Sequence, residues 1–260
     1  MRRILSRLAF VLLLALVAAG CVSRPPDTLT QVGAIDGLLA GVYDGEVTCG
    51  ALRRHGNFGI GTFDKLDGEM ILLDDVVYQA RTDGKVYRAP DELKTPFATV
   101  VTFTPDFRYT LPEGCNFAGM ETFLDQAIPT RNAFYAIRIE GRLRALTYRS
   151  VPAQTRPYPP LAKVTESQAV FNLKDAEGTL VGFRAPPFVK GLNVPGYHLH
   201  FISRDRQQGG HVLALELATG TVELDVNSRA VVLLPEHGDF LSADLARERT
   251  QELQKVEKGR

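Results

Sequence analysis

Three histidines that lie close together in the sequence are the residues best suited to chemistry. His198 and His200 flank a single leucine, and His211 follows a Gly-Gly pair. Alternate residues of a β-strand point to the same face, so a strand through His198 and His200 would direct both imidazoles to one side. The polar stretch 205–210 can turn the chain and bring His211 beside them on a returning strand. Three imidazoles with a fourth position left open match a catalytic zinc site, and iron, manganese or nickel would also accept these ligands.

A simpler interpretation of the His-x-His pair is a partly exposed polar face of a strand. The third histidine, placed after a turn, favours the metal site over that interpretation. The other two histidines, His55 and His237, stand apart from this group. We therefore expect both of them to be surface or loop residues.

The elements that would position the histidines are mostly strands. Runs rich in β-branched and aromatic residues alternate with turn signals such as Asp67-Gly68 and Asp83-Gly84. Glu140-Gly141 divides two such runs and predicts a hairpin, and Glu177-Gly178 predicts another turn. The expected strands are 59–63, 70–79, 86–88, 98–104, 133–140, 142–151, 169–173, 179–184, 197–203, 211–217, 221–225 and 230–234.

Three helices are expected beside these strands. Apolar residues recur at helical spacing between residues 28 and 42. A short helix is predicted for residues 119–128, where Pro129 would stop it. A third helix, capped by Ser242, would run to about Val256.

A stretch with four prolines, residues 152–160, marks a natural boundary. The N-terminal sheet domain would then span residues 31–151, and the C-terminal zinc-binding sheet domain would span residues 152–260. The sequence predicts an α+β fold: two strand-rich α/β halves built on mixed, mainly antiparallel sheets with a few flanking helices.

The overall composition fits a packed globular protein. The 260 residues include 30 Lys+Arg and 30 Asp+Glu, so the formal net charge is zero, and 45% of the residues are hydrophobic. Disorder is excluded, because it requires low hydrophobicity and high net charge. A neutral chain without a basic block does not match a nucleic-acid-binding protein, so no nucleic-acid partner is expected. A chain of this length can fold without a structural metal, so a metal would serve chemistry.

The N-terminus has the pattern of an export signal. Three arginines within the first seven residues precede an apolar stretch from Leu8 to Val17, and small residues then lead to Cys21. This order is typical of a bacterial lipoprotein signal, in which the cysteine is lipidated. A plain secretory signal with an incidental Cys21 is the alternative. We expect a signal peptide over residues 1–20, a tether over residues 21–30, and a protein that is lipid-anchored at the cell envelope, on the periplasmic or outer surface side.

Export also bears on the two other cysteines. Cys49 and Cys115 are the only pair left in the mature chain, in a compartment that permits disulfides. The even count predicts a disulfide between them, with two separate thiols as the alternative.

Longer motifs resemble one enzyme family. The run GLNVPGYHLHFI at 191–202, followed by Asp205 and by GGHVL at 209–213, closely resembles α-acetolactate decarboxylase. The resemblance extends through the mature chain, in LAGVYDG (39–45), HGNFGIGTFDKLDGEM (55–70), FYAIRIEG (134–141), RSVPAQTRPYPPL (149–161), EGTLVGFRAPPFVKGLNVPGYHLHF (177–201) and FLSADL (240–245). The lipoprotein signal is an addition to this pattern.

The resemblance implies a zinc-dependent carboxy-lyase. It would convert 2-hydroxy-2-methyl-3-oxobutanoate to (R)-acetoin and CO2, in acetoin and butanediol biosynthesis. The cofactor would be Zn2+, with no thiamine, pyridoxal or flavin. The partner would be a small-molecule 2-hydroxy-3-oxo acid substrate, and the usual assembly would be a homodimer.

The same resemblance assigns roles to particular residues. By the HxH and GGH motifs, the zinc ligands would be His198, His200 and His211. By the GTF and LDGE motifs, Thr62 would lie at the substrate pocket and Glu69 would be an active-site carboxylate.

Two further roles fall on an arginine and on the C-terminal tail. By the RSVP motif, Arg149 would be the active-site arginine. A glutamate of the tail would lie beside the metal, with Glu257 as the best match and Glu252 as a weaker alternative. Glu69 and Glu257 could both handle the proton that the reaction requires, and the sequence does not order them.

Two other classes of protein remain open. A lipid-anchored metal carrier would need the histidines alone, so Glu69, Arg149 and the acidic tail argue against it. A cupin-like metal oxygenase also uses histidines on strands. That fold commonly adds a carboxylate ligand near the HxH pair. The only carboxylate between His200 and His211 is that of Asp205, which lies in the predicted turn.

Overall fold

The computed structural model of the chain describes residues 27–258. The predicted signal peptide, residues 1–20, lies outside the described residues, as do Cys21 and the first part of the predicted tether. The predicted end of the tether at residue 30 is wrong, because residues 28–30 already belong to strand β1 (Thr28–Val32).

The first sheet has seven strands in the order β15-β1-β8-β3-β4-β5-β6. At one edge β15 runs parallel to β1, and the other neighbours pair antiparallel. Besides β1, the members are β3 (Phe58–Thr62), β4 (Glu69–Leu73), β5 (Val76–Ala80), β6 (Val86–Arg88), β8 (Ala98–Val101) and β15 (Arg229–Leu233). Two shorter strands, β2 (Val47–Thr48) and β7 (Lys94–Thr95), form a separate pair.

The second sheet is antiparallel and has the order β10-β14-β11-β12-β13, with β9 paired to β14. Strand β13 also pairs with the start of β14, so β11, β12, β13 and β14 close into a ring. The members are β9 (Phe107–Thr110), β10 (Cys115–Asn116), β11 (Phe134–Ser150), β12 (Ala169–Ala185), β13 (Gly196–Ser203) and β14 (Gly209–Asn227). The predicted α+β class with mixed, mainly antiparallel sheets is confirmed.

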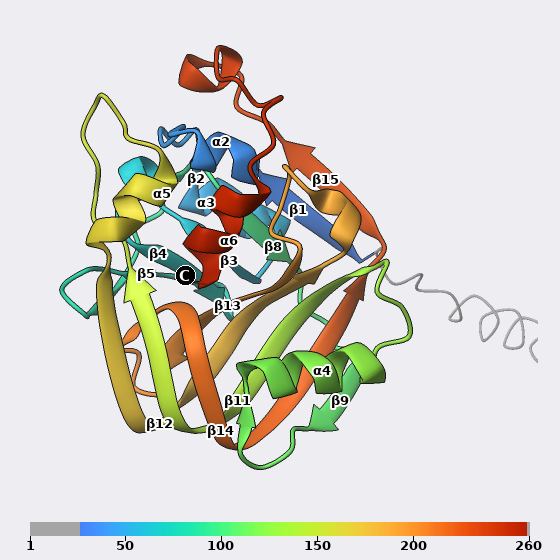
Figure 1. Cartoon of the computed structure of the whole chain (residues 1–260). Coiled ribbons are helices and arrows are strands. Elements are labelled where there is room, and N and C mark those ends of the chain that lie inside the picture. Colours follow the sequence, from blue (N-terminus) through green and yellow to red (C-terminus); the bar gives the residue numbers. More distant parts are fainter. Residues whose placement is uncertain (1–26, 259–260) are drawn as a thin grey trace, which may run out of the picture.

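Short helices flank the two sheets. They are α2 (Ile35–Leu39), α3 (Cys49–Leu52), α4 (Phe117–Ala127), α5 (Leu161–Val164) and α6 (Thr250–Lys258). Figure 1 shows α2, α3 and α5 in the upper half of the view, the long strands of the second sheet with α4 in the lower half, and α6 between them. Among residues 27–258, no helix is both long and apolar enough to cross a membrane.

A hydrophobic core joins the two sheets. Burial of apolar side chains from both sheets is the main force that holds the layers together. Its buried members are Leu29, Phe58, Ile60, Ile71, Leu73 and Val101 from the first sheet and Ala136, Val181, Phe183 and Ile202 from the second.

The turns predicted at Glu140-Gly141 and Glu177-Gly178 are wrong, because β11 and β12 run straight through them. Gly141 instead pairs with Gly178 on one side and with Gly220 on the other. A Cβ atom on Gly141 would lie 2.3 Å from the carbonyl oxygen of Thr219. These glycines therefore mark a close approach of backbones within three long strands, not reversals of the chain.

The helix predicted for residues 28–42 is replaced by β1 and α2. Gly33 separates them with a φ of 66°, and a Cβ there would lie 2.2 Å from the carbonyl oxygen of Pro96. Glycine adopts this left-handed conformation without the usual steric cost, so the chain changes direction there. The helix predicted for residues 119–128 is confirmed as α4, which is capped by the side chain of Asn116.

The C-terminal helix is shorter than predicted. It begins at Thr250 instead of Ser242, and residues 242–249 form turns and bends without regular helix. The backbone N–H of Thr250 donates to the carboxylate of Glu248 at 2.9 Å, so this first N–H group of α6 has an acceptor. The helix buries Leu253 and Val256 in a hydrophobic cluster that includes residues of α2 and α5.

The predicted disulfide is wrong. Cys49 begins α3 and Cys115 lies in β10, and both residues are free and buried. Cys49 packs in a hydrophobic cluster of the first sheet, whereas Cys115 packs in a different cluster of the second sheet and α4. Each cysteine therefore serves as a small apolar core residue.

The boundary predicted between residues 151 and 152 does not separate the two sheets. Strand β11, before the boundary, belongs to the second sheet, and β15, after it, belongs to the first. The C-terminal part of the chain thus completes an edge of the sheet that the N-terminal part begins.

Candidate metal centre and active site

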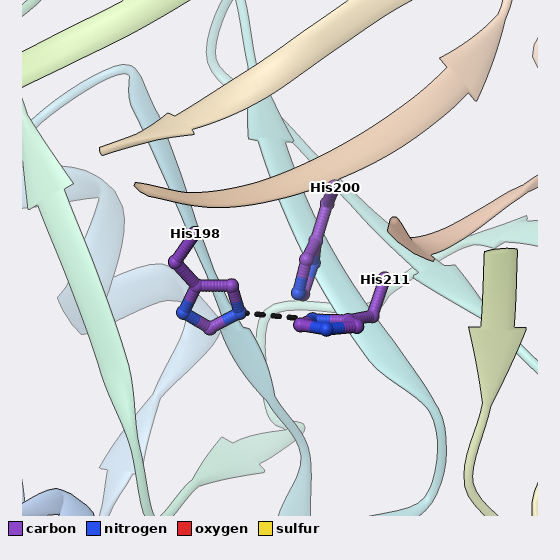
Figure 2. A group of neighbouring side chains, drawn as sticks. All are labelled: His198, His200 and His211. Carbon is purple, nitrogen blue, oxygen red and sulfur yellow. Dashed lines mark hydrogen bonds between the residues drawn. The ribbon is translucent and has the colours of Figure 1, made fainter. Parts of the chain in front are cut away.

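The hairpin of β13 and β14 brings the three histidines together. His198 and His200 alternate along β13, and His200 pairs directly with His211 at the start of β14. The nitrogen atoms that could bind a metal all lie within 4.8 Å of one another. Figure 2 shows the three rings converging, with a contact between His198 and His211. The predicted convergence of these three side chains, called the histidine trio below, is confirmed.

Backbone carbonyl groups orient two of the rings. Nδ1 of His200 lies 2.8 Å from the carbonyl oxygen of Met70 in β4, and Nε2 of His211 lies 3.2 Å from that of Glu257 in α6. A carbonyl oxygen only accepts, so in a neutral imidazole these nitrogens carry the proton and the opposite nitrogens keep a free lone pair. Nε2 of His200 and Nδ1 of His211 are therefore the atoms available to a metal.

Burial keeps all three imidazoles neutral. Desolvation and the nearby charge of Arg149 lower the pKa of His198 to about 3. The pKa values of His200 and His211 are also lowered well below the usual value, chiefly by burial. Metal binding requires the neutral form. Near neutral pH, the histidine trio can thus accept a cation without first losing protons.

Two carboxyl groups, one buried (Glu69) and one with little exposure (Glu257), approach the histidine trio. Oε2 of Glu69, at the start of β4, lies 3.8 Å from Nε2 of His200. Oε2 of Glu257, in the last turn of α6, lies 3.7 Å from Nε2 of His198 and 3.9 Å from Nε2 of His211. Burial raises the pKa of each carboxyl group to about 7. A group with such a pKa can give and take protons at neutral pH.

Arg149 stands beside His211 across the β11–β14 pair and is 4% exposed. Its Nε lies 3.8 Å from Oε1 of Glu69. Its Nη1 donates to the carbonyl oxygen of Val256 at 2.6 Å and to Oε1 of Gln168 at 3.0 Å. The guanidinium therefore links the last turn of α6 to the strand face that carries the histidines.

Thr62 ends β3 and pairs with Glu69 of β4. Directly paired residues project to the same face of a sheet, so the threonine hydroxyl and the carboxyl group lie side by side. Oγ1 of Thr62 donates to the carbonyl oxygen of Gly68 at 2.8 Å. The hydroxyl oxygen is thereby fixed in the wall of the site.

One small cavity, of about 40 Å³, unites these side chains. Its polar wall consists of Thr62, Glu69, Arg149, His198, His200, His211 and Glu257, and its apolar wall includes Ile35, Leu38, Leu66, Phe97, Val151, Leu161 and Val256. A larger cavity of about 690 Å³ shares His198, His211 and Glu257 with it. These three shared residues stand between the small cavity and the larger one.

The donor set fits a divalent cation. Around a tetrahedral zinc ion with Zn–N bonds of 2.0–2.1 Å, two ligand nitrogens are about 3.3 Å apart. Nε2 of His198 and Nδ1 of His211 are 3.1 Å apart. A cation would also stabilise the ionised forms of Glu69 and Glu257, which burial disfavours. The residues present therefore suit a site of three imidazoles with carboxylate groups within reach.

The two tail glutamates have different surroundings. Glu252 pairs with Arg249 at 2.8 Å and with Arg247 at 3.2 Å, away from the histidines. Of the two candidates, Glu257 alone lines the small cavity.

The other residues singled out in the sequence lie away from the site. His55 and His237 are exposed, as predicted. Asp205 lies in the turn between β13 and β14, where its carboxylate accepts a hydrogen bond from Ser203 at 2.6 Å. It serves that turn and does not reach the histidine trio.

Sequence reasoning missed the groups that orient the site. The carbonyl groups of Met70 and Val256 bind His200 and Arg149, but main-chain atoms leave no signal in residue types. Gln168 follows a short 3-10 turn and belongs to no motif. The only signal that could have found it is the pairing of β11 with β12, which places residue 169 opposite residue 150.

Several known proteins that are similar to this chain belong to one enzyme family. A family model described as alpha-acetolactate decarboxylase matches residues 29–247. The chain is 49% identical over 232 residues to the alpha-acetolactate decarboxylase of Methanosarcina mazei, covering 89% of this chain and 81% of that one. With the alpha-acetolactate decarboxylase of Methylococcus capsulatus it shares 44% identity over 227 residues, 87% of each chain. The X-ray structure of alpha-acetolactate decarboxylase from Bacillus subtilis strain 168 is similar, with a TM-score of 0.87, 36% identity, and coverage of 88% of this chain and 99% of that one.

Proposed function

Because the chain belongs to the alpha-acetolactate decarboxylase family, and is thus a carboxy-lyase, we propose that it converts α-acetolactate to (R)-acetoin and CO2 with zinc as its cofactor. Its place would be in acetoin and butanediol biosynthesis. The observation that carries the proposal is the convergence of the histidine trio with Glu69, Arg149 and Glu257 on one small cavity.

The substrate, 2-hydroxy-2-methyl-3-oxobutanoate, carries a carboxylate and a hydroxyl on the carbon next to a ketone. Nε2 of His198, Nε2 of His200 and Nδ1 of His211 would hold the zinc ion. When bound, the ion would polarise the ketone and hydroxyl oxygens and stabilise the negative charge that develops as CO2 leaves. The carbonyl of Met70 holds His200 in the tautomer that this role requires.

Arg149 and the cavity wall would orient the substrate. A buried guanidinium binds a carboxylate through two parallel N–H bonds, which fixes the direction of the carboxylate. Thr62 would offer its hydroxyl oxygen beside Glu69. The apolar wall, which includes Leu66 and Phe97, would surround the two methyl groups and exclude water.

Glu69 and Glu257 would handle the proton. Loss of CO2 breaks a carbon–carbon bond and leaves its electron pair in the carbon skeleton, so a carbon atom must gain a proton. In the metal-free site, burial raises the pKa of both carboxyl groups to about 7. Beside a bound cation, the group that acts as the acid would first take up a proton and then deliver it to the carbon atom. Delivery from one fixed side would give a single enantiomer. General acid catalysis of this kind contributes typically 10²–10⁴-fold to a rate.

The two alternative classes gain no support. A metal carrier has no use for a buried arginine and two carboxyl groups of low exposure around its ligands, because each charge withdrawn from water costs free energy. For a cupin-like oxygenase, the carboxylate near the HxH pair, Asp205, is engaged in a turn.

The decisive experiment is an assay of purified protein with racemic acetolactate. We expect metal-stripped protein to be inactive, zinc to restore activity, and chiral chromatography to show only (R)-acetoin. The His198→Ala/His200→Ala double variant is the control, and it should fold but regain no activity with zinc. Racemic acetoin, or a full complement of zinc in the double variant, would contradict the proposal.

We also propose that Cys21 is lipidated, that the mature chain is anchored at the cell envelope, and that the protein forms a homodimer. The support for the anchor is the order of basic, apolar and small residues before Cys21. Mass spectrometry of the natively expressed N-terminus tests the lipid, and an intact Met1 would contradict it. Light scattering of the detergent-solubilised protein tests the dimer.

A further inference from the structure

The guanidinium of Arg149 uses its N–H groups unequally. Nη1 has two N–H bonds, and both are engaged, one by Oε1 of Gln168 at 3.0 Å and one by the carbonyl oxygen of Val256 at 2.6 Å. Within residues 27–258, Nε is buried and donates to no partner. Its nearest carboxylate oxygen, on Glu69, is 3.8 Å away, which is beyond hydrogen-bond distance.

The pattern of bonds defines which edge of the guanidinium is free. The N–H groups of Nε and Nη2 lie side by side and form a fork that matches the two oxygens of a carboxylate. Because Nη1 is saturated on the other side, this fork is the part of Arg149 that remains for a ligand. Arg149 lines the small cavity beside Glu69 and the histidine trio.

Gln168 is one of the two groups that fix this orientation. It is a half-buried residue that follows the turn Thr165–Ser167, and its N–H donates to the carbonyl oxygen of Thr165 at 3.3 Å. The backbone is therefore anchored next to the side chain that binds Nη1. An arginine side chain has many rotamers, so an acceptor at a fixed place removes freedom that a ligand would otherwise have to restrict.

We propose that Gln168 is a positioning residue, which holds Arg149 so that the fork of Nε and Nη2 faces the substrate carboxylate. This inference rests on the proposed function, because it deepens the way in which the same site binds a 2-hydroxy-3-oxo acid. Gln168 itself does not touch the substrate and acts through Arg149. Its loss should therefore weaken binding of ligands that carry a carboxylate and leave ligands without one unaffected.

The test uses the zinc-loaded full chain and two ligands that differ in the carboxylate. Acetolactate carries it, and acetoin, the product, lacks it. Gln168→Met keeps the length of the side chain and removes the acceptor. We expect the KM for acetolactate to rise about tenfold, the value of one charge-assisted hydrogen bond, while the inhibition constant of acetoin changes less than about twofold.

Two further variants make the result specific. Gln168→Glu keeps an acceptor oxygen at the same distance and should hold KM within about threefold of the wild type. Gln126→Met makes the same exchange on the exposed face of α4, outside both cavities, and should change neither constant. If Gln168→Met does not fold, Gln168→Asn decides instead, because its shorter amide should produce the same selective rise in KM.

The outcomes separate this inference from the proposed function. Equal changes of both constants in Gln168→Met, no change in either, or a Gln168→Glu variant as impaired as Gln168→Met would overturn the positioning role alone, provided that the wild type forms acetoin. A zinc-loaded wild type that forms no acetoin would overturn the proposed function and this inference with it.

Discussion

At the scale of single residues, burial shifts the pKa values of the site in opposite directions: it lowers those of the histidines and raises those of the carboxyl groups. The same desolvation that lowers the pKa of His198 raises the pKa values of Glu69 and Glu257 and so favours their protonated forms. Each group therefore avoids a charge in a place where water cannot stabilise one. A divalent cation would reverse this preference for the carboxyl groups.

Mutation of either carboxyl group should impair catalysis without preventing metal binding. Glu69→Gln and Glu257→Gln each keep the shape of the side chain and remove its proton chemistry. We expect each to lower kcat by roughly 10²–10⁴-fold, the typical contribution of general acid catalysis. Elemental analysis should find zinc still bound. A variant that kept the full rate and full (R) selectivity would show that its carboxyl group has no part in proton transfer.

The raised pKa values also predict how zinc binding depends on pH. At pH 6, below the pKa of about 7, both carboxyl groups of the metal-free protein hold a proton, whereas the imidazoles are already neutral. A cation that ionises both groups should release up to about two protons at pH 6 and few at pH 8. Calorimetry in buffers of different ionisation enthalpy measures this number. The Glu69→Gln/Glu257→Gln double variant should release none, and release of about three protons would instead indicate the histidines.

At the scale of elements, α6 is attached to the site by its last turn. Arg149 binds the carbonyl of Val256, and His211 binds the carbonyl of Glu257. Unsatisfied carbonyls at the end of a helix favour such partners. The helix is also held by apolar packing of Leu253 and Val256.

Truncations of α6 should separate chemistry from stability. A chain that ends at Val256 should lower kcat at least as far as Glu257→Gln, because it also removes the carbonyl that binds His211, and it should melt near the wild-type temperature. A chain that ends at Glu252 also loses Leu253 and Val256, whose burial contributes about 1.5–3 kcal/mol each, so its melting temperature should fall. Thermal unfolding and acetoin formation are measured on both. If the shorter deletion kept full activity, Glu257 would be an ordinary tail residue.

The paired glycines Gly141, Gly178 and Gly220 lead to a prediction about the three long strands of the second sheet. Gly141→Ala places a Cβ 2.3 Å from the carbonyl oxygen of Thr219, so the backbones must move apart. We expect a loss of about 1–3 kcal/mol in the free energy of unfolding, as for other overpacked sites. Gly37→Ala in α2 is the control, because its Cβ would meet Phe240 at an ordinary 3.5 Å. Equal melting temperatures for Gly141→Ala and the wild type would contradict the close approach.

At the scale of the whole molecule, local patterns were predictable and long-range pairings were not. The histidine trio follows from strand alternation plus a nearby turn, both of which can be read within 198–211. The glycines of β11 and β12 misled because a turn and a close backbone approach both require glycine. Glu69 and Arg149 meet only through the packing of two sheets, so motif resemblance alone brought them to attention.

The C-terminal helix and the disulfide are two further predictions that failed because the sequence does not show which parts of the chain pack together. The helical spacing over residues 242–256 corresponds to a helix only from Thr250 onward. The side chains of residues 242–249 are exposed or only partly buried, so little packing would hold a helix there. The disulfide failed because an even number of cysteines carries no information about distance. The two cysteines fall into separate hydrophobic cores, and only the long-range packing of the chain decides that.

Those separate thiols make the protein its own probe of unfolding. Cys49 reports on the core of the first sheet and Cys115 on that of the second, and burial raises the pKa of the Cys49 thiol to about 11, which suppresses its reaction with alkylating reagents. Each thiol should become reactive only when its own core opens. Pulsed alkylation followed by peptide mapping would then reveal, without any introduced label, which half of the molecule opens first under denaturant or heat, and whether zinc delays one half or both.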